Sequence, residues 1–417
     1  MAPLDRRGFL QSSAAVTAAS LAVQPAQARA AQGDLEFALV GAGNQGRHIA
    51  GQLLKVSGAR LAAVCEINPL NAAEAKKLAP QARVYEDWSD LLAKERNLAA
   101  VIVALPEHTH ADASIAALKA GKHVFCEKPM AYAIDEARAM IAARDVANRV
   151  LQIGQQRRSN PLYYLAERLV QKEGVLGEIL RIDAFWDRET DWKRPLPKLD
   201  KDFSKWGFPT LDHLVNWRLY RKYGHGLMTE NGTHQMDASG WLLGGKRPRY
   251  VCGMGTSRYR DGRETHDICS AEYMYEGDYI VRFTQDFHQG FNYGWSYGEL
   301  LLGADGAMRI TAEQEIWLYD KQRKPTRISI ERLGAIELGG VGSTVEELKA
   351  AEGDRTGGGL RTYSYANEMR IFAHAVREGT KPTCTGEIGL NSIAVTITGT
   401  DAQFANEYRK FDAKMFA

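Results

Sequence analysis

A glycine triplet with the spacing Gly41-x-Gly43-x-x-Gly46 encloses Asn44 and Gln45. This spacing suits dinucleotide binding: Gly41 permits a tight turn, Gly43 lets the backbone approach a pyrophosphate, and Gly46 lets a helix pack closely on a strand. The diphosphate would lie at the N-terminus of the next helix, where unpaired N–H groups and the helix dipole favour an anion. We therefore expect these five residues to contact a dinucleotide cofactor.

An acidic residue follows at the distance expected for a ribose contact. Glu66 lies about 20 residues beyond Gly46, at the end of the apolar run 61–65. Its carboxylate could accept hydrogen bonds from both ribose hydroxyls, and its charge repels the 2′-phosphate of NADP. NAD is therefore favoured as the cofactor, while Arg47 and Lys76 keep NADP open.

A lysine stands where it could assist hydride chemistry. Lys128 follows the predicted strand 122–126, and Pro129 ends that strand because proline cannot donate a ladder hydrogen bond. The amine would lie at the sheet edge beside the nicotinamide, within reach of a hydroxyl whose carbon loses hydride. We expect Lys128 to be catalytic and also to contact the cofactor, together with Glu127.

Two histidines follow the apolar run 99–105. Leu105, Pro106, His108 and His110 would lie at the carboxyl edge of the sheet, where ligands of open α/β folds bind. We expect all four to contact the cofactor, with the histidines lining the nicotinamide ribose. Because no third metal-binding side chain lies nearby, we predict no metal site.

The elements that would position these residues alternate between apolar runs and helical segments. The apolar runs are at residues 37–40, 61–65, 99–105, 122–126 and 150–154. Such continuous runs are typical of parallel strands buried on both faces. After the glycine turn, Ile49 and Leu53 repeat at four residues, which indicates one apolar face of a helix. The pattern predicts an α/β dinucleotide-binding Rossmann domain over residues 33–155.

The second half of the chain has a different pattern. Alternating runs separated by glycine-containing turns predict antiparallel strands at 271–275, 279–283, 299–302, 308–310 and 316–319. A helix is expected at 161–172 and another at 363–377, before a final helical stretch at 386–408. The glycine-rich region 339–359 is predicted to be a mobile loop. Residues 156–417 would thus form an α+β domain for substrate binding and oligomerisation.

Four features together resemble the Gfo/Idh/MocA oxidoreductase family. They are the glycine turn, the position of Glu66, the segment from Leu105 to His110, and the motif Glu127-Lys128-Pro129. The resemblance implies a Rossmann domain joined to an α+β domain whose large, open, mostly antiparallel sheet covers the cofactor and often mediates oligomers. It also implies that Lys128 is the catalytic lysine, and that the protein is a homo-oligomer, a dimer or tetramer.

The resemblance assigns roles to a second motif. His234 and Asp237 are three residues apart, so they share one face if a helix begins there. The corresponding family motif faces the substrate and nicotinamide, which implies that both side chains transfer protons or orient the substrate. The chain departs from the family at Glu230, where many members have Asp, and at Trp241, where several dehydrogenases have His or Tyr.

The segment 187–223 is rich in aromatic and charged residues. Aromatic faces stack on the C–H faces of sugars, while charged groups bind hydroxyls, so the segment suits a carbohydrate. The predicted substrate contacts are Arg157, Trp192, His213, Arg218, Tyr223, Glu230 and His234. Tyr223, His213 or His225 could supply the group that Trp241 replaces.

The beginning of the chain has the pattern of an exported protein. Arg6-Arg7, a short mildly apolar segment at 12–23 and small-residue sites near Ala30 predict a twin-arginine signal peptide over residues 1–30. We therefore expect a periplasmic or otherwise exported protein. No later stretch has the roughly 18 consecutive apolar residues of a membrane helix, so no membrane insertion is expected after processing.

Composition narrows the possible partners. The chain has 53 Lys and Arg against 51 Asp and Glu, and this near balance argues against a nucleic-acid footprint. Five cysteines are scattered without metal-site spacing, and a disulfide between Cys252 and Cys269 remains possible.

These observations favour an NAD-dependent oxidoreductase that acts on a sugar or glycoside by hydride transfer. Because NAD is scarce outside the cytosol, the cofactor would be tightly bound and recycled in place. One alternative is an NAD-dependent glycoside hydrolase that works by transient oxidation, elimination and re-reduction. Another is a noncatalytic sugar-binding or partner-binding protein.

Overall fold

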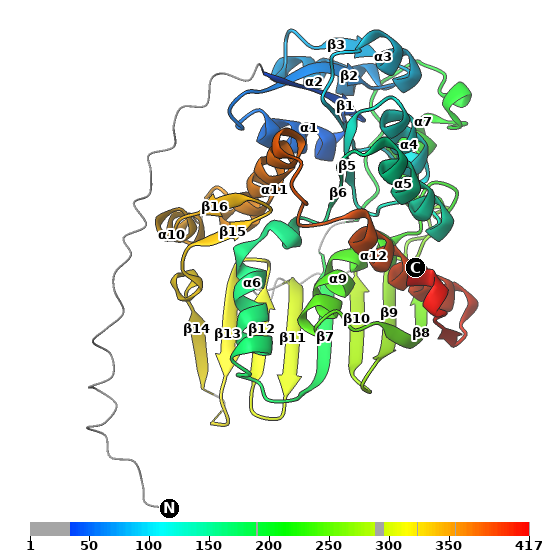
Figure 1. Cartoon of the computed structure of the whole chain (residues 1–417). Coiled ribbons are helices and arrows are strands. Elements are labelled where there is room, and N and C mark those ends of the chain that lie inside the picture. Colours follow the sequence, from blue (N-terminus) through cyan, green and yellow to red (C-terminus); the bar gives the residue numbers. More distant parts are fainter. Residues whose placement is uncertain (1–33, 189–190, 288–295, 323, 355, 417) are drawn as a thin grey trace, which may run out of the picture. The chain divides into compact units, whose positions relative to one another are not determined.

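The computed structural model describes residues 34–188, 191–287, 296–322, 324–354 and 356–416 (Figure 1). The predicted signal peptide at residues 1–30 lies outside the described residues. Two sheets, one above the other in Figure 1, organise the part of the chain from Leu35 onward.

The first sheet has six strands in the order β3-β2-β1-β4-β5-β6, and every neighbouring pair is parallel. Its strands are β1 Leu35–Val40, β2 Ala59–Cys65, β3 Arg83–Tyr85, β4 Ala100–Val103, β5 His123–Glu127 and β6 Leu151–Gly154. In β1, Phe37 and Leu39 belong to one hydrophobic cluster, whereas Ala38 and Val40 belong to another. Both faces of the strand are therefore buried, which explains the continuous apolar run.

Helices from both ends of the chain cover this sheet. They are α1 Asn44–Leu53, α2 Pro69–Leu78, α3 Trp88–Lys94, α4 His110–Lys119 and α5 Ile134–Ala147, joined by the C-terminal α11 Gly359–Glu378 and α12 Gly386–Ala405. Phe372 of α11 packs against Phe37 and Phe125. The C-terminal helices thus complete the core of the N-terminal domain.

The second sheet has nine strands in the order β14-β13-β12-β11-β7-β10-β9-β8-β17. They are β7 Ile179–Asp187, β8 Pro248–Thr256, β9 Ile268–Tyr275, β10 Ile280–Asp286, β11 Tyr297–Gly303, β12 Ala307–Thr311, β13 Glu315–Tyr319, β14 Pro325–Ile328 and β17 Arg409–Lys410. Only β7 and β10 pair in parallel; the other described pairs are antiparallel. The predicted fold class, a Rossmann domain plus a mostly antiparallel open sheet, is confirmed.

Helices α6 Pro161–Glu167 and α9 Gly232–Leu242 lie on one face of this sheet (Figure 1). Helix α6 continues as a π-helical turn, Arg168–Lys172, so the predicted helix at 161–172 is present. A four-residue helix, α8 Leu227–Glu230, directly precedes α9. These two helices bring Glu230, His234 and Asp237 between the sheets.

The prediction of a mobile loop at 339–359 was wrong. A small two-stranded sheet, β15 Ile336–Leu338 and β16 Val341–Ser343, leads into helix α10 Val345–Gly353. Thr344 accepts a hydrogen bond from the backbone of Glu347, whose side chain accepts one from the backbone of Thr344. Thr344 and Glu347 have the spacing of a capping box in the sequence, but the prediction rested on the glycines alone.

Residues 191–223 of the predicted aromatic segment fold into short helical turns and one helix, α7 Leu211–Val215. Its core is a separate cluster of Phe203, Phe208, Trp217 and Tyr223. The segment is tied to the first domain because the ammonium of Lys201 donates to the Ile67 carbonyl at 2.9 Å.

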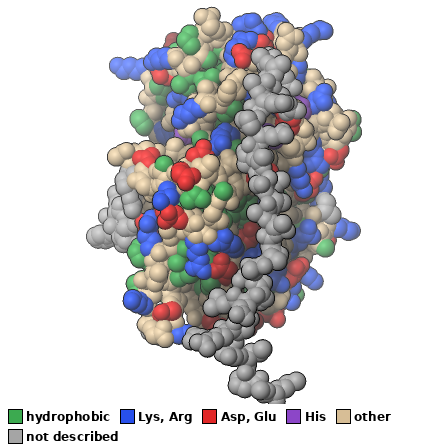
Figure 2. Space-filling view, turned by 60° about the vertical axis from the view of Figure 1, so that its left-hand side comes forward, with side chains coloured by type: hydrophobic (Ala, Val, Ile, Leu, Met, Phe, Trp, Pro, Cys, Tyr) green, Lys and Arg blue, Asp and Glu red, His purple; other side chains and the backbone are tan. Residues whose placement is uncertain are grey.

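The cysteines carry no disulfide. All five are free, and strand pairing places Cys252 opposite Glu272 and Cys269 opposite Gly255. The disulfide between Cys252 and Cys269 that the sequence allowed is therefore excluded. Within the described residues, no helix combines the length and apolarity needed to cross a membrane. Lys and Arg are interspersed with Asp and Glu on the face shown in Figure 2.

Candidate active site

The glycine turn leaves room for a bound group at one of its three glycines. Gly41 has φ +92°, and a Cβ there would lie 2.4 Å from the Ala104 carbonyl oxygen. A Cβ on Gly46 would lie 2.0 Å from the Gly41 oxygen, whereas one on Gly43 would meet nothing within 4 Å. Helix α1 also has no side-chain cap at its N-terminus. The residues therefore fit a diphosphate placed over Gly43.

Glu66 lies beside this turn. One carboxylate oxygen accepts from the Ala42 N–H at 2.7 Å and the other from the Asn68 N–H at 2.8 Å. Burial raises the pKa of Glu66, although these N–H groups act in the opposite direction. The two cations that could have bound the 2′-phosphate of NADP form hydrogen bonds within the chain. Arg47 donates to Asn44 Oδ1 at 2.7 Å and Lys76 to the Ala82 carbonyl at 2.9 Å.

The glycine turn is connected directly to the candidate catalytic lysine. Gln45 Nε2 donates to Glu127 at 2.8 Å, and the other Glu127 oxygen accepts from the Lys128 backbone N–H at 3.0 Å. Burial raises the pKa of Glu127. The start of helix α1 and the end of strand β5 are therefore held in register by one carboxyl group.

Lys128 extends toward the second domain. Its Nζ donates to the backbone carbonyl of Glu230 at 2.6 Å and lies 3.8 Å from Glu230 Oε2. Glu230 also accepts from Arg218 Nε at 2.9 Å. Burial would raise the pKa of Glu230, but Arg218 and Lys128 outweigh it and lower that pKa. Glu230 is thus a buried carboxylate between two cations.

His234 lies one turn farther along. It is 4 % exposed and stacks on Trp186 with ring centroids 5.7 Å apart. Burial, reinforced by the charges of Lys128 and Arg157, lowers the pKa of His234 well below 6.5. Its Nδ1 has no hydrogen-bond partner among the described residues. A neutral imidazole with a free nitrogen is therefore available to a ligand.

The two histidines after β4 occupy different surroundings. His110 is buried, with Nδ1 2.7 Å from the Pro129 carbonyl and Nε2 2.8 Å from the Leu105 carbonyl, so both nitrogens contact the chain. His108 packs against Tyr223 with ring centroids 5.0 Å apart, and burial lowers the pKa of His108 to about 4. His110 positions the turn that carries Lys128; a ribose contact by either histidine remains a prediction.

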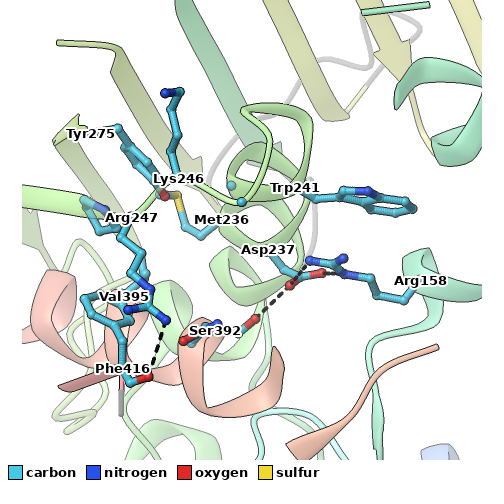
Figure 3. Close-up of a pocket in the computed structure, with 14 residues that line it drawn as sticks. Arg158, Met236, Asp237, Trp241, Lys246, Arg247, Tyr275, Ser392, Val395 and Phe416 are labelled. Atoms are coloured by element: carbon cyan, nitrogen blue, oxygen red, sulfur yellow. Dashed lines mark hydrogen bonds and ion pairs between the residues drawn. The ribbon is translucent and has the colours of Figure 1, made fainter. Parts of the chain in front are cut away.

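Asp237 does not face the same partners as His234. Its carboxylate accepts from Arg158 Nε at 2.8 Å and Nη2 at 3.0 Å, and from Ser392 Oγ at 3.1 Å (Figure 3). The Arg158 guanidinium lies 4.5 Å from the Trp241 ring centroid. These residues line a pocket of about 70 Å³ to which neither Lys128 nor His234 contributes. The expected shared face is thus divided between two sites, and we reassign Asp237 to support of the fold.

The expectation that Arg157 binds substrate is corrected in the same way. Its side chain is 1 % exposed and pairs with Glu299 and, at 3.2 Å, with Glu313. Tyr163 donates to Glu299 at 3.0 Å. A guanidinium enclosed by two carboxylates in the core has no direction left for a soluble ligand, so Arg157 joins elements of the second domain.

The aromatic segment contributes unequally. Tyr223 is 0 % exposed and its hydroxyl donates to the Gly207 carbonyl at 2.9 Å. His213 lies 2.7 Å from the Thr210 hydroxyl and stacks on Tyr220. Trp192 is only partly buried and lies 5.8 Å from the guanidinium of Arg218. The structure therefore brings Trp192 and Arg218 toward Glu230, and uses Tyr223 in packing.

Sequence reasoning missed two further groups, Glu107 and Arg188. Glu107, inside the motif already singled out, is fully buried and lies 2.8 Å from His225 Nδ1, so a carboxyl–histidine pair joins the two domains. Burial raises the pKa of Glu107. Arg188 follows β7 and packs on Trp186. Glu107 could have been suspected from its motif, but the partners of Arg188 depend on tertiary folding.

Comparison with known proteins agrees with this geometry. Residues 35–155 match a family model described as an oxidoreductase family with an NAD-binding Rossmann fold. Residues 164–313 match the GFO/IDH/MocA C-terminal domain. Together the two matches cover more than half of the chain.

Similar proteins include sugar-acting enzymes. The chain is 28% identical over 258 residues to a glycosyl hydrolase family 109 protein of Shewanella amazonensis, covering 54% of each chain. It is 30% identical over 184 residues to a levoglucosan dehydrogenase of Pseudarthrobacter phenanthrenivorans, covering 43% of this chain and 42% of that protein. The matches thus span about half the length of these relatives.

Solved structures share the fold. A levoglucosan dehydrogenase in complex with NADH and levoglucosan superposes with a TM-score of 0.70 at 19% identity, covering 90% of this chain and 99% of that one. An aldose-aldose oxidoreductase from Caulobacter crescentus gives 0.67 at 20% identity, covering 91% and 100%. With both domains matched and the glycine turn, Glu66 and Lys128 in place, the chain belongs to the Gfo/Idh/MocA family of NAD-binding oxidoreductases.

Proposed function

We propose that this protein is an exported NAD-dependent oxidoreductase that oxidises a hydroxyl of a sugar or glycoside and keeps its cofactor tightly bound. The observation that carries the proposal is the position of Lys128 Nζ at the carboxyl edge of the Rossmann sheet, 2.6 Å from the Glu230 carbonyl. Export rests on the sequence of residues 1–30 alone.

Lys128, His234 and Glu230 have different roles in the proposed proton transfer. Oxidation of a carbinol to a carbonyl releases one hydride and one proton, and bound NAD would supply the hydride acceptor. Lys128 hydrogen-bonds the reacting oxygen and assists loss of its proton, because the ammonium stabilises the developing negative charge while neutral His234 accepts the proton. His234, kept neutral by burial and nearby cations, accepts a hydrogen bond from the same or an adjacent hydroxyl. Glu230 holds Lys128 in place.

The carbohydrate class is supported by the relatives and by the walls of the site. Two relatives named above are a levoglucosan dehydrogenase and a glycosyl hydrolase, and others are inositol 2-dehydrogenases. Trp192 and Trp217 lie 5.8 Å and 4.1 Å from the Arg218 guanidinium, which combines aromatic faces with charged donors. Such surfaces suit polyhydroxylated rings.

Retention of the cofactor is tested by purification without added nucleotide. Protein precipitated with acid should release NAD or NADH in a molar ratio near that of the polypeptide, as measured by chromatography of the supernatant. A panel of sugars should then change the absorbance of the bound nicotinamide. Protein that holds no dinucleotide and binds none when it is added would contradict the proposal.

A second candidate is an NAD-dependent glycoside hydrolase, favoured by the family 109 relative, whose match extends over 258 residues. Oxidation at C3 would acidify the C–H at C2, elimination would break the glycosidic bond, water would add, and re-reduction would restore the cofactor. Release of nitrophenol from nitrophenyl glycosides without added NAD would identify this activity. Carbonyl product without aglycone release would identify the oxidoreductase.

We also propose a homo-oligomer formed through the open sheet. Met254 on β8 is 68 % exposed and Ile280 on β10 is 36 % exposed, so apolar side chains stand on the face that α6 and α9 leave uncovered. Light scattering during gel filtration should give a mass of two or four chains. Met254→Lys should lower that mass if this face is the interface.

A further inference from the structure

Positive charge exceeds negative charge on the substrate side of the candidate site. Arg188, Arg194 and Arg218 approach it from strand β7 and the aromatic segment, and Lys128 approaches from the Rossmann sheet. Glu230 is shared by Lys128 and Arg218. Among the described residues, neither Arg188 nor Arg194 forms an ion pair with a carboxylate. Two guanidinium groups therefore have no carboxylate partner within the part of the chain that the structure describes.

Arg188 is closely connected to the reacting centre. It follows β7, as Phe287 follows β10, so both lie at the same edge of the two parallel central strands. Its guanidinium carbon lies 5.3 Å from the ring centroid of Trp186 and 5.7 Å from that of Phe287. The Trp186 ring also stacks on His234. Arg188 and the candidate catalytic imidazole thus pack on one indole ring.

The surroundings of Arg188 and Arg194 disfavour their charge. Burial lowers the pKa of Arg188, and the neighbouring charges of Arg361 and Arg218 lower it further. Burial and Arg218 likewise lower the pKa of Arg194, although Glu230 opposes them. Guanidinium groups remain charged at any physiological pH, so both cations are held in unfavourable surroundings. A bound anion would reduce this electrostatic cost.

We propose that the substrate is an acidic carbohydrate, one that carries a carboxylate or phosphate, and that Arg188 binds this group while a ring hydroxyl faces Lys128 and His234. Arg194 and Arg218 add to the attracting field. A planar guanidinium can donate two parallel hydrogen bonds to either oxyanion. The inference rests on the proposed function, because it places the substrate against the same lysine and histidine.

The cofactor diphosphate is the competing anion. Its expected place is over Gly43 at the N-terminus of α1, on the first sheet, whereas Arg188 belongs to the second sheet and packs on Trp186. The two possibilities differ in what loss of Arg188 would affect. Loss of a cofactor contact would lower the dinucleotide content, whereas loss of a substrate contact would leave it unchanged.

The test compares Arg188→Gln with Arg181→Gln in protein that carries its NAD. Arg181 is a matched control because it lies on the same strand but forms a surface ion pair with Asp183 at 3.0 Å. The probes are glucuronate, galacturonate and glucose 6-phosphate, each paired with glucose or galactose. Binding is followed by calorimetry, turnover by nicotinamide absorbance, and cofactor content by acid release.

We expect at least one acidic sugar to exceed its neutral partner in kcat/KM or affinity by about tenfold or more, with the difference shrinking at high salt. Arg188→Gln should remove most of that preference and leave the NAD content unchanged, while Arg181→Gln should alter neither the preference nor the NAD content. The carboxylate and phosphate arms show which oxyanion is bound.

Three results would overturn the inference. They are equal use of neutral and acidic sugars, binding of none of the acidic sugars, or loss of NAD in Arg188→Gln. Oxidation of neutral sugars with NAD retained would leave the proposed function intact. An empty protein that gains no activity when NAD is supplied would instead remove the proposed function itself.

Discussion

Replacement of Asp237 by Asn should damage stability more than chemistry. The family motif makes Asp237 a natural acid or base, but the structure engages its carboxylate with Arg158 at 2.8 and 3.0 Å and with Ser392 at 3.1 Å. Asparagine keeps one acceptor oxygen and replaces the other with an NH₂ group. That group would point its hydrogens at the Arg158 donors, leaving a buried guanidinium with at most one partner.

The expected loss follows from burial. The Asp237 side chain is 4% exposed and the Arg158 side chain 16%, so solvent screens the pair only weakly. Removing one partner of a buried ion pair typically destabilises a protein by about 3–5 kcal/mol. Replacing both partners by apolar side chains, Asp237→Leu with Arg158→Met, should recover more than half of that loss, because no buried charge is then left unpaired.

Urea denaturation followed by tryptophan fluorescence measures the stability, with NAD saturating so that cofactor binding contributes equally to each variant. Turnover of the folded fraction, using whichever sugar the substrate panel identifies, measures the chemistry. We expect kcat within about threefold of the wild type for Asp237→Asn. A loss of about 100-fold or more in kcat with an unchanged denaturation midpoint would show that Asp237 acts on the substrate, and our reassignment would be wrong.

Four further results are expected. Lys128→Met should lower kcat by about 10²–10⁴-fold while acid release still finds bound NAD; unchanged turnover would remove Lys128 from the mechanism. Glu66→Ala should weaken NAD binding by about 1.5–3 kcal/mol in a dialysis titration, since it removes the charged hydrogen bonds that we expect Glu66 to accept from the ribose. The pH–rate profile should lack an inflection near 6.5 from His234, whose pKa is lowered by burial, so His234→Gln should change its height but not its shape in that range. Glu368 is buried near Glu127, neither of its carboxyl oxygens has a partner among the described residues, and burial raises its pKa well above 4.5. The free energy of unfolding should therefore fall as pH rises above 4.5. The excess of this free energy in Glu368→Gln over the wild type should grow by about 1.4 kcal/mol per pH unit, as denaturation at pH 5, 6 and 7 can verify.

The first domain could be predicted closely from the sequence because its signals are local. Strands buried on both faces require continuous apolar runs, and the glycine turn is required by contacts within a few residues and with one neighbouring strand. Gly41 must leave space for the Ala104 carbonyl, and Gly46 for Gly41 itself. The position of Lys128 follows from β5 ending at Glu127, directly before it. Each of these constraints appears in the sequence where it acts.

The second domain was predicted in class but less well in detail. Alternation located its strands, because one face of each is packed and the other open. The helix at Val345–Gly353 was missed although Thr344 and Glu347 mark its start, since glycines on either side favoured a loop. The return of α11 and α12 to the first domain has no local signal, because Phe372 meets Phe37 and Phe125 only in the folded chain.

Charged residues show most clearly why the site could be read only in part. Arg157, Arg158 and Arg188 are the same residue type in similar polar contexts, yet Arg157 is enclosed by two glutamates, Arg158 is paired with Asp237, and Arg188 pairs with no described carboxylate. The carboxylate partners of Arg157 and Arg158 lie more than 70 positions away in the sequence.

An overall charge near zero therefore says little about the field inside the site. The chain has almost equal numbers of basic and acidic residues, but many of these charges neutralise each other in local ion pairs. The charged residues that act on His234 are positive. Composition describes only an average over many residues of the surface. The field that a substrate meets depends on which charges the fold leaves unpaired, and for this protein that remainder points to an anionic ligand.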